Sequence, residues 1–132
     1  MKPSIQELIE KCTHESHAGL LVFPEVLNRL IGVGVESYFV DYRGESATYY
    51  FANNEALMVS MGMPQIEIQE TFDKDAIVMA IRGAQSDQLR YPEFLRQTMS
   101  AGCIGYMVWI SGGHVSYFGR LGEAHVEHFT SE

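Results

Sequence analysis

The residues best suited to chemistry near the start of the chain are His14, Glu15 and His17. Histidines three apart lie on one face of a helix and can share a metal ion, and the carboxylate between them could act as a base. The spacing differs from the His-Glu-x-x-His pattern of zinc proteases, in which the histidines are four apart. The simpler interpretation is a polar helix end, where histidine stabilises the helix dipole. A small metal-dependent enzyme is therefore an alternative function, and the sequence predicts no other cofactor.

A second group of side chains lies on one face of the strands predicted at 35–43, 47–52 and 103–111, because strand side chains alternate between two faces. The group consists of Phe39, Asp41, Arg43, Thr48, Tyr50 and Trp109. Arg43 would pair with an anionic group while the aromatic rings stack on the ligand. An apolar cleft with a few polar groups is the usual ligand site, so these residues predict a binding groove. The alternative is a surface Asp–Arg pair beside packed aromatic rings.

Three further histidines lie near the C-terminus of the chain. His125 and His128 are three apart in a predicted strand, with His114 in the strand before it. Residues three apart in a strand point to opposite faces, so this pair cannot easily share a metal ion. The pattern predicts an edge strand that is kept polar against aggregation.

An internal repeat shows which elements must position these residues. When the chain is compared with itself at a shift of 68, twelve of the 64 aligned positions are identical. Among them are Pro24 with Pro92, where a helix begins, and Gly34 with Gly102, where a helix ends. Such self-similarity at a fixed shift is typical of a duplication. We therefore expect one domain, with repeat one at about 1–62, a connector at about 63–71 and repeat two at about 72–132.

Each repeat is predicted to form two helices followed by three antiparallel strands. Apolar residues recur at helical spacing and then alternate, as the two periods require. The predicted helices are 4 to about 16, 24 to 32 or 34, 73–83 and 92–102, with Ser4 and Asp73 as N-caps. The predicted strands are 35–43, 47–52, 55–60, 103–111, 114–120 and 123–129, with a further short strand at 65–70. The fold class is α+β, and the repeats should pack with pseudo-twofold symmetry around one core. Both one six-stranded sheet and two three-stranded sheets remain open.

The amino-acid composition limits the classes of partner that we expect for this protein. The chain has 132 residues, 46% of them hydrophobic, and a net charge of −8 from 17 acidic and nine basic residues. The basic residues are scattered, whereas binding a phosphate backbone needs clustered Lys and Arg, so nucleic acid is not an expected partner. No apolar run approaches the ~18 residues of a membrane span. Cys12 and Cys103 are expected to be small buried residues. We expect a cytoplasmic protein.

Five segments together resemble a known family. They are Glu15-Ser16-His17-Ala18-Gly19, Phe23-Pro24-Glu25-Val26, Gly34-Val35-Glu36-Ser37-Tyr38, Val40-Asp41-Tyr42-Arg43 and Thr48-Tyr49-Tyr50. They resemble the YdfO-like family, bacterial and often prophage-borne proteins of unknown function, some of which are called phage envelope proteins. The resemblance implies an α+β domain from a bacterium or its phage. It supplies no catalytic residues.

The leading functional hypothesis is a prophage-type accessory protein without enzymatic activity. It would bind a small ligand or a host protein at the junction of the two repeats. The first alternative is the metal-dependent enzyme built on His14, Glu15 and His17. The second is a structural protein that forms a homodimer by pairing edge strands.

Overall fold

The computed structural model describes residues 1–129 and contains four helices and six strands within them. The helices are α1 (Pro3–His17), α2 (Phe23–Gly32), α3 (Lys74–Gln85) and α4 (Tyr91–Ser100). The strands are β1 (Val35–Asp41), β2 (Ser46–Phe51), β3 (Ala56–Ser60), β4 (Cys103–Trp109), β5 (His114–Gly119) and β6 (Ala124–His128). The α+β class predicted from the sequence is confirmed.

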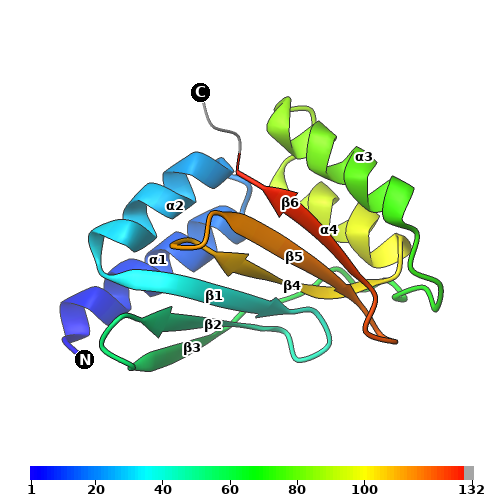
Figure 1. The fold of residues 1–132 in the computed structure, drawn as a ribbon. Coiled ribbons are helices and arrows are strands. Elements are labelled where there is room, and N and C mark those ends of the chain that lie inside the picture. Colours follow the sequence, from blue (N-terminus) through cyan, green and yellow to red (C-terminus); the bar gives the residue numbers. More distant parts are fainter. Residues whose placement is uncertain (130–132) are drawn as a thin grey trace.

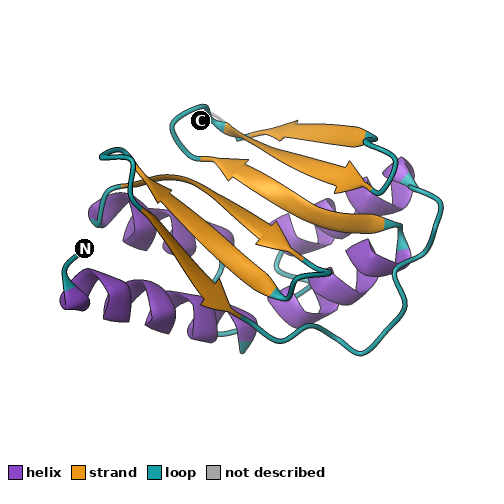
Figure 2. Cartoon of the chain, turned by 90° about the horizontal axis from the view of Figure 1, so that it is seen from below, coloured by secondary structure: helices purple, strands orange, loops and turns teal. Residues whose placement is uncertain are grey.

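All six strands belong to one antiparallel sheet in the order β3-β2-β1-β4-β5-β6 (Figure 1). The sequence left one sheet or two sheets open, and the pairing of β1 with β4 decides for one. All four helices lie on the same side of this sheet (Figure 2). None of the helices in the described part of the chain is long and apolar enough to cross a membrane.

The core lies between the sheet and the helices. Tyr38 and Val40 of β1 and Tyr106 and Val108 of β4 face the helices, and each is at most 7% exposed. These are the positions that alternation in the sequence assigned to the core face, and that prediction is confirmed. Cys12 and Cys103 are buried free thiols, also as expected.

Helix ends follow their local sequence, with one exception. The Asp73 carboxylate accepts a hydrogen bond from the Ala76 N–H at 3.1 Å, so Asp73 is the predicted N-cap of α3. The predicted cap at Ser4 is wrong, because α1 begins at Pro3 and follows Lys2, whose side chain makes no capping bond. Proline fits the first turn of a helix because its fixed φ is helical and its missing N–H has no partner there.

The connector between β3 and α3 contains no strand, so the short strand predicted at 65–70 is wrong. Its backbone is held by bonds to other parts of the chain. The Met61 N–H donates to the Glu45 carbonyl at 2.9 Å, and the Met63 N–H donates to the Glu45 carboxylate at 3.1 Å. The Gln69 N–H donates to the Met99 carbonyl at 3.2 Å. Each of these backbone N–H groups is already bonded, so it is not available for pairing with a neighbouring strand.

Hydrogen bonds between buried hydroxyl groups connect helices α1 and α4 to the sheet. Three pairs of oxygens lie 2.7 to 2.8 Å apart in the core. They are Thr13 with Tyr49, Tyr42 with Thr98, and Tyr91 with Tyr106. In each pair one residue comes from α1 or α4 and the other from the sheet or its end. Because buried polar groups are costly without partners, these pairs favour one seating of the helices.

The β1–β4 pair leaves no room for a side chain at Gly105. A Cβ there would lie 3.3 Å from the Phe39 ring and would collide with the Val40 carbonyl oxygen. The Phe39 ring reaches across this gap to Phe118 of β5, with ring centroids 6.5 Å apart. Glycine therefore lets an aromatic ring of β1 contact one of β5, two strands away.

Alkaline pH is expected to unfold the protein. Burial raises the pKa of Tyr49 to about 12, and burial also raises the pKa of Tyr38, Tyr42 and Tyr106 well above the usual value of a tyrosine. Below about pH 10 these groups are neutral in both states, so they do not affect stability. Above it the unfolded chain ionises first, and each buried tyrosine then lowers the unfolding free energy by about 1.4 kcal/mol per pH unit.

Circular dichroism and tyrosinate absorbance, followed together from pH 9 to 12, test this expectation. The absorbance change of the buried tyrosines should coincide with the change in circular dichroism, because the buried hydroxyls ionise only as the chain unfolds. Tyrosinate absorbance that rose to completion while the circular dichroism stayed native would contradict it.

Gly105→Ala is expected to lower the free energy of unfolding by about 1–3 kcal/mol, since the new methyl group must push β1 away from β4. Gly32→Ala is the matched control, because a Cβ there meets nothing within 4 Å. Urea unfolding measures both changes. A Gly105→Ala protein as stable as the Gly32→Ala protein would show that the sheet relaxes without cost.

Candidate functional site

One face of the sheet carries no helix, and we call it the open face (Figure 2). Its side chains alternate with the core residues of each strand, and strand register places them beside one another. The open face includes Ser37, Phe39, Asp41, Thr48, Tyr50, Met58, Met107, Trp109, His114, Ser116, Phe118, Val126 and His128. Aromatic rings, thioethers and hydroxyl groups dominate this surface.

Large and small side chains alternate across the open face. Ser37 lies between Tyr50 on β2 and Trp109 on β4 and is only 7% exposed, whereas its neighbours are 38% and 40% exposed. Ser116 lies in the same way between Met107 and Val126 and is 8% exposed. The large side chains thus shelter the small ones, and the apolar surface is continuous from strand to strand.

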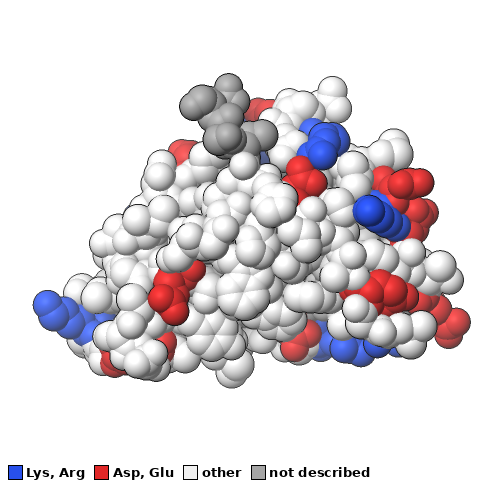
Figure 3. Space-filling view, in the orientation of Figure 1, with Lys and Arg blue, Asp and Glu red and all other residues white. Residues whose placement is uncertain are grey.

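The open face has almost no charge. None of the six strands contains Lys or Arg, and their carboxylates are Glu36, Asp41 and Glu127. Glu127 pairs with Arg82 of α3 at 2.6 Å, so it is neutralised on the helix side. In Figure 3 the middle of the face is white, and charged residues gather toward its margins. A net charge of −8 therefore sits mainly outside this surface.

The structure brings together four of the residues predicted to bind a ligand. Phe39 is the direct cross-strand partner of Thr48 on one side and of Met107 on the other. Tyr50 and Trp109 lie on opposite sides of Ser37 in the neighbouring row. These side chains form a continuous patch across β2, β1 and β4.

Asp41 occupies the next position after Phe39 on this face of β1, beside Ser46 and Gly105, whereas Arg43 lies beyond the end of the strand. The Asp41 carboxylate accepts hydrogen bonds from the backbone N–H groups of Arg43 and Gly44, at 3.1 and 3.0 Å. It therefore caps the turn that follows β1, as aspartate often does. Arg43 is exposed in that turn. The two residues stabilise and flank the end of the face, and the carboxylate is used by the backbone.

The three residues predicted as metal ligands lie on α1, on the other side of the sheet. Glu15 pairs with Arg29 of α2 at 2.8 Å and with Lys11 at 3.8 Å. His14 is exposed, and the buried Nδ1 of His17 has no hydrogen-bond partner. Among residues 1–129, no group of three or more His, Cys, Asp or Glu side chains is placed to hold a metal ion.

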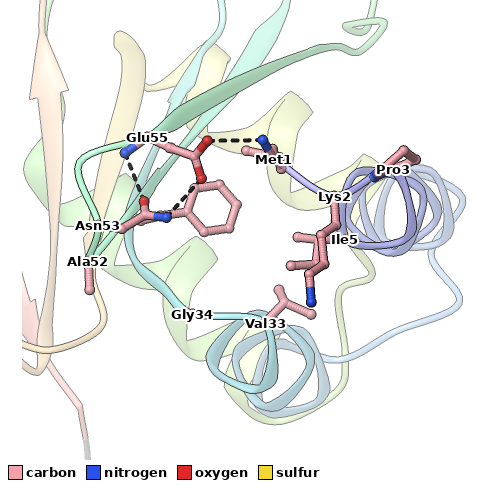
Figure 4. A pocket seen from close by; sticks show the side chains of 10 residues that line it. Met1, Lys2, Pro3, Ile5, Val33, Gly34, Ala52, Asn53 and Glu55 are labelled. Atoms are coloured by element: carbon pink, nitrogen blue, oxygen red, sulfur yellow. Dashed lines mark hydrogen bonds and ion pairs between the residues drawn. The ribbon is translucent and has the colours of Figure 1, made fainter.

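Two hollows lie away from the open face. The larger, of about 750 Å³, opens between the start of α1, the end of α2 and the β2–β3 turn (Figure 4). At its rim Glu55 pairs with the Met1 ammonium at 3.0 Å and accepts a bond from Asn53 at 2.8 Å. A second hollow of about 420 Å³ lies beside the connector, against Tyr42. Neither hollow is lined by the predicted ligand residues.

Buried thiols and phenols cannot serve as nucleophiles at neutral pH. Burial raises the pKa of Cys103 to about 11 and raises that of Cys12. Burial also raises the pKa of the core tyrosines. Each of these groups therefore stays protonated, and a thiol is reactive only as its thiolate.

Sequence reasoning missed part of the open face. Alternation in the predicted strands places Phe118 and Val126 away from the core, so a signal for them existed. Their contact with the predicted residues depends on strand order, which alternation does not contain. Met58 was missed for the same reason, because it is joined to Phe39 only through Thr48.

Comparison with known proteins identifies a family whose function is unknown. The model of the family described as "Protein of unknown function (DUF1398)" matches residues 8–127. Uncharacterized proteins of Mycobacterium bovis and Mycobacterium tuberculosis are 30% identical over 77 residues, which cover 56% of this chain. The match spans about half the length of these relatives, 47%. The narrower YdfO-like resemblance stays a prediction. The chain belongs to the DUF1398 family of proteins of unknown function.

Proposed function

We propose that this protein is a non-enzymatic interaction module, and that its open face binds a flat, apolar and uncharged surface of another protein. The observation that carries the proposal is the composition of that face. Phe39, Tyr50, Trp109 and Phe118 line it together with methionines, and the strands contain no Lys or Arg. Aromatic residues and methionine are enriched in protein interfaces, while contiguous exposed apolar patches are rare on monomers.

Charge argues for a protein partner over nucleic acid. Exposed aromatic rings on a sheet can stack on bases, but such platforms combine stacking with a positively charged groove. Here the strands supply no cation, and a net charge of −8 repels a phosphate backbone. An uncharged partner surface avoids both this repulsion and the cost of burying an unpaired charge.

Shape favours a protein over a small molecule. Small ligands are held in concave sites that cover most of their surface. The two hollows described above are lined by residues outside the open face, whereas the aromatic side chains are spread over several strands. Strand spacing gives the six-stranded face a width of about 25 Å. A surface of this size suits a small, transient interface.

We also propose that the chain arose by duplication, with repeats at about 1–62 and 72–132 related by a pseudo-twofold axis. Gly34 and Gly102, matched by the 68-residue shift, both have positive φ, +91° and +85°. The register irregularities of β1 and β4 fall at matched positions, Val35/Ser37 and Cys103/Gly105. The axis would pass between β1 and β4, at the centre of the open face. The prophage role and cytoplasmic location stay expectations from the resemblance and composition.

A photo-crosslinking amino acid at position 58 tests the interaction. Met58 is 66% exposed on the open face, and Met79 is 73% exposed on α3, so probes at the two positions form a matched pair. In cells, the probe at 58 is expected to crosslink another protein that the probe at 79 does not reach. Adding Trp109→Ser should lower the crosslink yield about tenfold, because aromatic residues dominate binding energy.

Three outcomes would contradict this proposal. Equal crosslinking from positions 58 and 79 would show random encounters. Crosslinks only between copies of the chain would make the partner a second copy and favour the homodimer. Crosslinks unaffected by Trp109→Ser, in a variant whose thermal unfolding matches the wild type, would move the binding surface away from the aromatic patch.

A further inference from the structure

His114 of β5 and His128 of β6 are direct cross-strand partners at the margin of the open face. Their ring centroids lie 5.6 Å apart, with the planes at 50°. The Phe129 N–H donates to the Gly113 carbonyl at 2.9 Å, so the adjacent residue pair is the hydrogen-bonded one. His114 and His128 therefore occupy a non-hydrogen-bonded position, where opposed side chains approach most closely.

This separation suits two imidazoles that share a metal ion. Zinc binds a histidine nitrogen at about 2.0–2.1 Å, which puts the ion about 3 Å from the centre of each ring. Two rings joined through such an ion at a tetrahedral or wider angle have centres roughly 5 Å apart. The observed 5.6 Å is reached from that arrangement by small rotations of the half-buried His114 and the exposed His128 side chains.

One ring nitrogen of His114 faces a backbone oxygen. Its Nδ1 lies 3.3 Å from the Gly112 carbonyl oxygen. A carbonyl oxygen can only accept, so in the neutral imidazole this contact favours the tautomer with the proton on Nδ1 and the lone pair on Nε2. Histidines that bind metals usually donate their other ring N–H in this way to a carbonyl or carboxylate.

The surroundings favour a cation. No Lys or Arg lies in any strand of the sheet, and the chain has a net charge of −8. Trp109 is the cross-strand neighbour of His114 on the other side, with ring centroids 6.2 Å apart. Because no cluster of three ligands occurs within residues 1–129, the pair contributes two protein ligands, and water fills the other positions.

We propose that His114 and His128 form a two-histidine site for a divalent first-row transition-metal ion. Imidazole ligands suit copper, nickel and zinc, and Cu²⁺ binds most tightly in this series. The site uses only residues of this chain, so it stands or falls separately from the proposed protein interaction. It also differs from the cluster predicted on α1, since His14 and His17 lie on the opposite side of the sheet.

Titration of the metal-free protein with CuCl₂ in a non-coordinating buffer tests the site. Trp109 is the only tryptophan of the chain, and bound Cu²⁺ quenches nearby indole fluorescence, so its emission reports binding. We expect saturable quenching at one Cu²⁺ per chain. His114→Ala and His128→Ala should each weaken it about tenfold or more, since one imidazole remains. Excess EDTA should restore the emission by removing Cu²⁺ from the site.

The double variant His14→Ala/His17→Ala is the matched control and should bind Cu²⁺ as the wild type does. Trp109→Phe should still take up one Cu²⁺ per chain in equilibrium dialysis, because the indole reports the metal and does not hold it. Linear quenching without saturation would overturn the proposal. So would an unchanged titration of His114→Ala, or a loss of binding only in the α1 double variant.

Discussion

The antiparallel pairing of β1 with β4 is the contact on which the rest of this structure depends. It joins three strands from each half of the chain into one sheet. It also sets the register that puts Tyr38, Val40, Tyr106 and Val108 on the same side. Because all four helices cover that side, the pairing also creates a second face that nothing in the described chain covers (Figure 2). Core and open face are thus two consequences of one register.

The two faces use aromatic residues in different ways. On the helix side, buried tyrosine hydroxyls find partners on α1 or α4, which satisfies their polar groups and orients the helix layer. On the open side, Phe39, Tyr50 and Trp109 have no helix to pack against. The apolar surface they leave in water favours association with another apolar surface, since that removes it from water.

Charged residues are also distributed unevenly between the strands and the rest of the chain. Only three of the 17 acidic residues lie in strands, so most of the protein's acidic excess lies outside the sheet. Ion pairs such as Glu15–Arg29 and Arg82–Glu127 join neighbouring elements on the helix side. A net charge of −8 opposes the approach of two copies of the chain, and the strands add no Lys or Arg to the open face.

Residue patterns alone determined the α+β class, the six strands, and which residues of each strand face the core, because alternation is a local property of the chain. They also placed Phe39, Thr48, Tyr50 and Trp109 away from that core. Local patterns could not reveal that Phe118 contacts Phe39 across Gly105, or that the Asp41 carboxylate binds its own turn. They placed His125 and His128 on opposite faces of one strand, and the register of the sheet then sets His128 beside His114. Such neighbours are decided by strand order and register, which arise only when distant segments bury their apolar faces together.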